Sequence, residues 1–352
     1  MTQRWLVSLS VAAFLAAGSA SGQTGLALSP STDKKIRPLP RTGDGHPDFG
    51  GLWTNVTITP LERPRNLAGK EFFTEQEATE YEKQTVGQRN RDRREPGSER
   101  DVANAYNDFW WDSGTKVVKT RRTSIVVDPP DGRIPPLTPE RQKQLAARAE
   151  AVKQRCERPG CEPENGGMPG PADGPEDRPL MERCLSFGTA GPPMLPSAYN
   201  NNYQIVQSAG FVAIDVEMAH DVRRISLDGS PHLPSTIRQW MGDSRGHWEG
   251  DTLVVDTTNF TDKLAFRGSD ENLHMVERFT LADPDTLLYR FTVEDPTAFT
   301  KPWTGEIPMV RTKGPLFEYA CHEGNSGLAG ILASARADEK KAAEEGAQQK
   351  QQ

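Results

Sequence analysis

The sequence lacks an excess of positive charge and lacks long apolar runs. Its 42 lysine and arginine residues are outnumbered by 49 aspartate and glutamate residues, which gives a formal net charge of −7. A protein that binds nucleic acid needs a basic face, so this balance argues against that class. Beyond the N-terminal segment, no apolar run approaches the ~18 residues that a membrane helix requires. The composition therefore argues against a polytopic membrane protein.

The motifs that mark common enzyme sites are also missing. The sequence contains no HExxH zinc motif, no Walker A loop and no GxGxxG fingerprint. We therefore expect no cofactor. What the sequence does contain is 31 glycines and 28 prolines among 352 residues. This exceeds average usage and predicts long irregular segments around a folded core.

The first 22 residues have the composition of a secretory signal peptide. Arg4 is their only charged residue, residues 5–17 form a short apolar stretch, and small residues follow as far as Gly22. A short buried helix is the alternative interpretation. We expect an exported protein, periplasmic or secreted, with no integral membrane span.

Four cysteines in an exported chain favour two disulfide bonds. Cys156 and Cys161 flank a short Pro-Gly loop in which a local bridge is natural, and that pairing would leave Cys184 for Cys321. The connectivity cannot be deduced from sequence alone. A zinc site is the alternative, although CERPGC lacks CxxC spacing and has no histidine nearby.

The distribution of apolar runs and turn residues along the chain predicts one β-rich domain with flanking segments. Within that domain, residues 59–200 form a partly helical insert, with helices expected at 74–93 and 139–156. The expected divisions are a signal peptide (1–22), a linker (23–47), the domain (48–335), a mobile loop inside its insert (157–179) and a disordered tail (336–352).

From about residue 199 to about residue 322, short β-branched and aromatic runs alternate with turn sequences. No stretch between them is long enough for a crossover helix, so we expect an antiparallel meander. Its strands would close, or nearly close, into a barrel or a sandwich. Candidate strands are 203–209, 211–217, 222–226, 236–241, 246–248, 252–258, 273–281, 286–294, 303–310 and 316–321, preceded by 48–58 and 123–128.

Two resemblances add to this prediction. Gly51-Leu52-Trp53 resembles the Gly-x-Trp feature of lipocalin-like barrels, in which the tryptophan plugs one end. That likeness implies that Arg311 covers the tryptophan by a cation–π contact. The insert at 59–200 departs from a plain lipocalin.

The chain also resembles a group of uncharacterised secreted bacterial proteins with no known activity, which implies export and nothing further. The matching segments are RTSIVVDPPDGRIPPLTPE (122–140), EDRPLMERC (176–184), IRQWMGDSRGHWEGDTLVVDTTNF (237–260) and YACHEGN (319–325).

Glu277 is the most informative candidate for chemistry. By alternation it shares a face with apolar residues of the run 273–281. A carboxylate on an apolar face is costly unless it is paired, and a barrel can use such a group as a general acid or base. Two structural alternatives are a pairing with Arg238 or Arg267 and a β-bulge that turns the side chain outward. Its expected helpers are His220, Asp221, Tyr289 and His322.

Other polar and aromatic side chains are candidates for contacting a ligand at the mouth of a barrel. The alternative for most of them is ordinary turn or hairpin chemistry. The candidates are Tyr199, Asn200, Arg245, Trp248 and Tyr289. A metal site would draw on His220, His274 and His322, although no pair of histidines shows ligand spacing.

The leading functional prediction is an exported barrel that binds a small, largely apolar or amphipathic molecule. Acid–base chemistry of the isomerase, hydratase, lyase or cyclase type is the enzymatic hypothesis that goes with it, because the sequence contains an interior carboxylate and no cofactor motif. Two alternatives stay open. One is a metal-dependent hydrolase that uses histidine and glutamate ligands, and the other is a non-catalytic envelope or scaffold protein.

Overall fold

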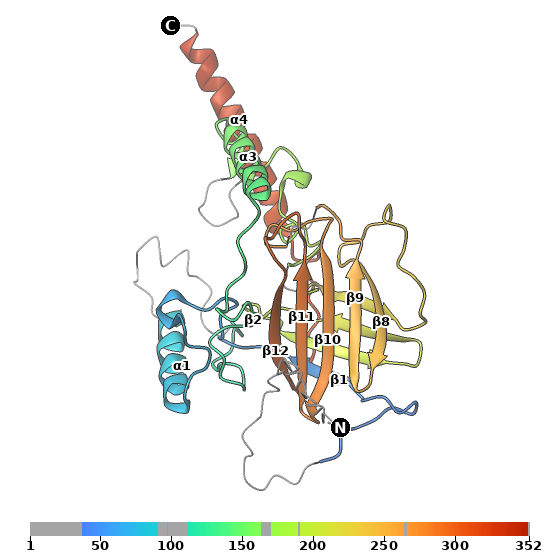
Figure 1. Cartoon of the computed structure of the whole chain (residues 1–352). Helices are drawn as coiled ribbons and strands as arrows, with labels where there is room; N and C mark the ends of the chain where they lie inside the picture. Colours follow the sequence, from blue (N-terminus) through green and yellow to red (C-terminus); the bar gives the residue numbers. More distant parts are fainter. Residues whose placement is uncertain are drawn as a thin grey trace, which may run out of the picture. The chain divides into compact units, whose positions relative to one another are not determined.

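A closed barrel of nine strands dominates the computed structural model, which describes residues 37–90, 97, 111–162, 170–188, 191–263 and 266–350. The strands follow the order β1–β5–β6–β7–β8–β9–β10–β11–β12, and β12 pairs with β1 to close the ring (Figure 1). This confirms the mainly β prediction. The expected signal peptide and most of the expected linker lie outside the described residues.

The elements of the barrel agree closely with the predicted runs, and β2 adds a short strand beside β12. Their bounds are β1 (Gly51–Thr54), β2 (Val126–Asp128), β5 (Asn202–Gln207), β6 (Phe211–Val216), β7 (Asp221–Ser226), β8 (Asp243–Glu249), β9 (Thr252–Thr258), β10 (His274–Asp283), β11 (Thr286–Glu294) and β12 (Trp303–Arg311).

The expectation of a wholly antiparallel meander is wrong at one place. β7 and β8 are parallel neighbours, so the chain between them must return along the barrel wall before β8 begins. Residues 227–242 make this return without a helix, and we call them the strap. The expected strand 236–241 lies within the strap and makes only a single bridge, between Gln239 and Phe260. The expected strand 316–321 is likewise irregular.

Side chains that alternate along the strands fill the barrel interior. On β11, Leu287, Tyr289, Phe291 and Val293 are all 0% exposed, as the alternation predicted. Gly305 on β12 faces this row, and a Cβ atom at that position would collide with the Phe291 ring. The interior is therefore packed tightly enough to require glycine at this position.

The N-terminal segment closes one end of the barrel. Trp53 is fully buried and donates its indole N–H to the carbonyl oxygen of Phe49 at 2.7 Å. The guanidinium of Arg311 lies 4.3 Å from the centre of the Trp53 ring, so the expected cation–π contact is confirmed.

Outside the barrel, both predicted helices are present as α1 (Glu75–Arg89) and α3 (Pro139–Arg155), and the Thr74–Glu77 capping box starts α1. The expected mobile loop and the expected disordered tail contain regular elements in their described parts. The loop's described parts form β3 (Cys161–Glu162), β4 (Gly170–Pro171) and η3 (Pro175–Asp177), and the tail belongs to α4 (Ser326–Gln349).

Two disulfide bonds tie these outer elements together. They join Cys156 to Cys161 and Cys184 to Cys321, which confirms two bridges and the more natural pairing. Residues Pro38–Gln352 cluster as one compact unit. In the described part of the chain, no helix is both long and apolar enough to cross a membrane.

The packing around Gly305 makes a testable prediction. The substitution Gly305→Ala forces the Phe291 ring to move inside a filled core, so it should lower the free energy of unfolding by about 1–3 kcal/mol. Urea denaturation measures this change. Gly330→Ala is the matched control, because nothing lies within 4 Å of its Cβ position and alanine favours the helix. Equal stabilities for the two variants would contradict the packing account.

Candidate functional site

Glu277 takes part in an ion pair in the barrel interior. It lies on β10 and is 0% exposed, and its Oε1 accepts a hydrogen bond from Nη1 of Arg223 on β7 at 2.8 Å. A second hydrogen bond joins Nη2 of Arg223 to Oε2 of Glu277. The two charges therefore meet in a bidentate pair away from water, the geometry that best compensates for their desolvation.

Hydroxyl groups from three other strands complete this network. Tyr289 donates its hydroxyl to Glu277 at 2.8 Å and accepts the backbone N–H of Met194 at 3.1 Å. Arg223 donates to Ser244 Oγ at 3.0 Å and to Thr257 Oγ1 at 2.9 Å. Burial raises the pKa of Tyr289 well above its ordinary value. The network is thus satisfied internally, which favours a structural role for Glu277.

The observed partner differs from the expected ones. Arg238 lies in the strap and Arg267 lies between β9 and β10, whereas Arg223 reaches Glu277 across the interior. The bulge alternative is wrong, because the register shift of β10 falls between Leu281 and Asp283. An interior arginine pairs with Glu277, but it is a different arginine.

Of the expected catalytic helpers, Tyr289 hydrogen-bonds to Glu277, whereas His220, Asp221 and His322 do not in the described structure. His220 receives the backbone N–H of Tyr319 on Nδ1 at 2.9 Å, and His322 is exposed in the turn after Cys321. Burial raises the pKa of Asp221 to about 6. All three lie at strand ends or in connections, whereas Glu277 lies inside the wall, so the structure does not assemble the expected catalytic group.

The expected ligand-contacting residues are dispersed over the barrel. Trp248 stacks on His46 with ring centres 4.4 Å apart at the end closed by Trp53, while Tyr199 stacks on Tyr319. Asn200 adopts a left-handed φ of 54° in a turn. Arg245 pairs with Asp243, and Tyr289 belongs to the interior network. These five residues do not form one site.

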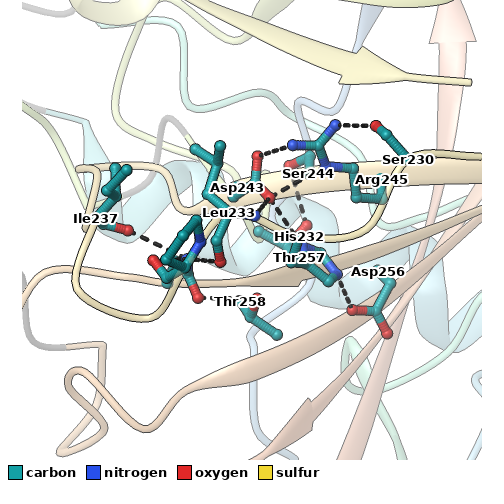
Figure 2. Close-up of polar contacts among 12 residues, drawn as sticks. Ser230, His232, Leu233, Ile237, Asp243, Ser244, Arg245, Asp256, Thr257 and Thr258 are labelled. Carbon is teal, nitrogen blue, oxygen red and sulfur yellow. Dashed lines mark hydrogen bonds and ion pairs between the residues drawn. The ribbon is translucent and has the colours of Figure 1, made fainter. Parts of the chain in front are cut away.

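The three histidines expected to bind a metal are also apart. His274 lies between Asp256 and Glu294, whereas His220 contacts the segment around Tyr319. Among the residues that the structure describes, no group of three or more histidine, cysteine, aspartate or glutamate side chains is arranged to hold a metal ion. His232, which was not a candidate from the sequence, and His274 both contact Asp256. Figure 2 shows the contact between His232 and Asp256.

A cavity of about 440 Å³ lies at the end of the barrel where β1 ends and β5 begins. Its apolar wall comes from residues that follow β1, from residues that precede β5 and from Ile125, the residue before β2. Two arginines enter from α1 and from the β9–β10 connection. The lining residues are Thr57, Ile58, Thr59, Leu61, Arg89, Ser113, Ile125, Leu195, Pro196, Ser197, Ala198 and Arg267.

Both arginines at this cavity are exposed. Neither Arg89 nor Arg267 has a side-chain hydrogen-bond or ion-pair partner among the described residues, which leaves both guanidinium groups open to a ligand. Arg267 also holds a left-handed φ of 52°, which is uncommon outside glycine and asparagine. Strained backbone of this kind is often found where a side chain is positioned for function.

No protein-family model, curated protein or solved structure matches the sequence. The site must therefore be interpreted from its own geometry.

The buried ion pair predicts a specific pattern of stabilities. Glu277→Gln leaves the Arg223 charge buried and unpaired, so it should lower the free energy of unfolding by about 3–5 kcal/mol. The double substitution Arg223→Met with Glu277→Leu removes both charges and should recover most of that loss. A double-mutant cycle by urea denaturation measures both effects. A Glu277→Gln variant as stable as the native protein would contradict the structural role.

Proposed function

We propose that this protein binds a small amphipathic anion in the cavity at the end of the barrel. The observation that carries the proposal is the pair of unpartnered guanidinium groups, Arg89 and Arg267, beside an apolar wall. An arginine without a partner is ready to form charge-assisted hydrogen bonds with a carboxylate, sulfonate or phosphate.

The composition of the cavity supports an amphipathic ligand. Ile58, Leu61, Ile125 and Leu195 line the cavity, with Leu61 half-buried and the other three buried, so a hydrocarbon or aromatic body would contact chiefly Leu61. The hydroxyls of the threonine and serine residues in the wall can accept or donate hydrogen bonds beside the charged group. The volume falls within the range of about 300–1,000 Å³ that is typical of small-molecule sites.

Binding, rather than acid–base catalysis, is the function that this geometry supports best. Glu277 does not line the cavity, and its carboxylate is held by Arg223 and Tyr289. The two disulfide bonds support the accompanying proposal that the chain works in an oxidising compartment outside the cytoplasm.

A pair of fluorescent probes tests the proposal. Anilinonaphthalene sulfonate carries the anionic group, and N-phenylnaphthylamine has a similar aromatic body without the charge. Arg267→Gln should weaken the binding of the sulfonate about tenfold, the loss expected for one charge-assisted hydrogen bond, and leave that of the neutral probe unchanged. Fluorescence titration measures both affinities. Arg267→Lys keeps the charge and should restore part of the difference.

Arg148→Gln is the matched control, because Arg148 is an exposed arginine on α3 outside the cavity. It should not change the affinity for either probe. If neither probe binds, or if Arg267→Gln and Arg148→Gln have equal effects on the sulfonate, the proposed anion site is wrong.

A further inference from the structure

Arg267 lies at a corner of a two-residue hairpin turn. The backbone N–H of Phe266 donates to the carbonyl oxygen of Ser269 at 2.8 Å, and the N–H of Ser269 donates back to Phe266 at 2.9 Å. Arg267 and Gly268 form the two corners and have left-handed φ angles of 52° and 100°. A type I′ turn requires a positive φ at both corners, which costs an arginine more than a glycine. The surroundings of the turn must therefore hold this conformation.

Asp295, the residue after β11, fixes one side of the turn. The hydroxyl of Ser269 donates to Oδ2 of Asp295, and both residues are buried. The other carboxylate oxygen of Asp295 accepts the backbone N–H groups of Thr297 and Ala298 at 2.9 and 3.1 Å. Asp295 is thus held by its own chain segment and gives the Arg267 turn a rigid base.

Arg141, in the first turn of α3, fixes the residue that follows the turn. Its Nη1 lies 2.6 Å from Oδ2 of Asp270, and its Nη2 lies 3.2 Å from Oδ1. The same Nη2 lies 3.2 Å from Oγ1 of Thr297. The side chains of Arg141 and Asp270 are only 6% and 10% exposed, so the pair is bidentate and largely desolvated. Arg141 therefore joins the turn to the segment that Asp295 also organises.

Packing holds the flanks of the turn as well. The ring of Phe266 stacks on Trp303 of β12, with ring centres 6.1 Å apart and planes 21° apart. Gly268 lies against two leucines near the start of α3. A Cβ atom on Gly268 would come within 2.9 Å of Leu137 and 3.6 Å of Leu145. The turn is thus fixed by apolar contacts in addition to the two carboxylates.

We propose that Asp295 and Arg141 are positioning residues of the anion site, which fix the turn and thereby hold the guanidinium of Arg267 at the cavity. The proposal rests on the anion site proposed above and assigns the residues that pre-organise it. Neither Asp295 nor Arg141 lines the cavity, so both act through Arg267. A turn that is already fixed loses less conformational entropy when its arginine binds a ligand, and the affinity rises accordingly.

The buried charges beside an exposed turn support this role. Compared with apolar residues of similar volume, a buried ion pair contributes little net stability. What it does contribute is a defined geometry, because only one arrangement of Arg141 and Asp270 satisfies both charges. The exposed residue that this geometry fixes is Arg267.

The charged and neutral probes test the proposal, because only the sulfonate is expected to depend on Arg267. Ser269→Ala removes the hydrogen bond to Asp295 and adds no bulk. It should weaken the binding of anilinonaphthalene sulfonate about threefold and leave that of N-phenylnaphthylamine unchanged. A loss of stability alone would not separate the two probes. Ser244→Ala is the matched control, since it removes a buried serine hydroxyl from the barrel interior and should change neither affinity.

Arg141→Lys tests the second positioning residue without leaving Asp270 unpaired. Lysine keeps the positive charge but cannot reproduce the fork that contacts Asp270 and Thr297 together. It should also weaken sulfonate binding about threefold and spare the neutral probe. Arg178→Lys is the matched control, because Arg178 is a buried arginine with a bidentate contact to Glu182 and does not line the cavity.

A double substitution shows whether the positioning acts through Arg267. In the Arg267→Gln background, Ser269→Ala should cause no further loss of sulfonate affinity, because residues that act as one unit are not additive. An equal loss from Ser269→Ala with and without Arg267 would contradict the proposal.

Hydrogen exchange provides a measurement that needs no ligand. The amide of Phe266 should lose protection in the Ser269→Ala variant and keep it in the Ser244→Ala variant; unchanged protection in both would contradict the positioning role. If Arg267→Gln weakens sulfonate binding while Ser269→Ala and Arg141→Lys bind both probes as the native protein does, the positioning role is wrong and the anion site stands. If the native protein does not bind the sulfonate, both proposals are wrong.

Discussion

The ion pair between Arg223 and Glu277 is the constraint on which the barrel interior depends. Two charges enclosed by the wall lose their hydration, and the loss is tolerable only if every remaining polar group nearby is paired. Ser244, Thr257 and Tyr289 supply those partners from three more strands. The network therefore specifies how strands far apart in the sequence meet, in addition to any stability that it contributes.

This constraint also decides where a ligand can be accommodated. Large aromatic side chains occupy the interior around the network, and Trp53 with Arg311 closes one end. At the other end, residues without regular structure meet and leave the cavity that Arg89 and Arg267 line. The barrel thus serves as a rigid support for a site built from its connections, an arrangement common among binding proteins.

Much of the fold could be predicted because its signals are local. Alternation located β9 and β11, and the capping box located the start of α1. The parallel pairing of β7 with β8 could not be predicted in this way. It depends on the return of the strap along the barrel wall. Side-chain contacts such as those of Asn259 hold the strap there, and such contacts leave no periodic pattern in the sequence.

The candidate site was less predictable for a related reason. Alternation identified Glu277 as an anomalous charge in the core, but its partner lies 54 residues away and becomes apparent only when the barrel closes. Arg89 and Arg267 belong to no motif, and their meeting at one cavity becomes apparent only from the coordinates. The sequence itself contains one signal for Arg267. This residue precedes a glycine in a turn-rich connection, and binding residues are often found on such connections.

The central claim is that a ligand occupies the cavity at the barrel end and leaves the interior undisturbed. Isoleucine methyl groups report on both places, since Ile58 and Ile125 line the cavity whereas Ile214 and Ile307 lie inside the barrel. The direct measurement is a methyl NMR titration of the native protein with anilinonaphthalene sulfonate. The account predicts saturable shifts for Ile58 and Ile125 with Ile214 and Ile307 unchanged. Shifts confined to Ile214 and Ile307 would contradict it and would place the ligand in the barrel interior.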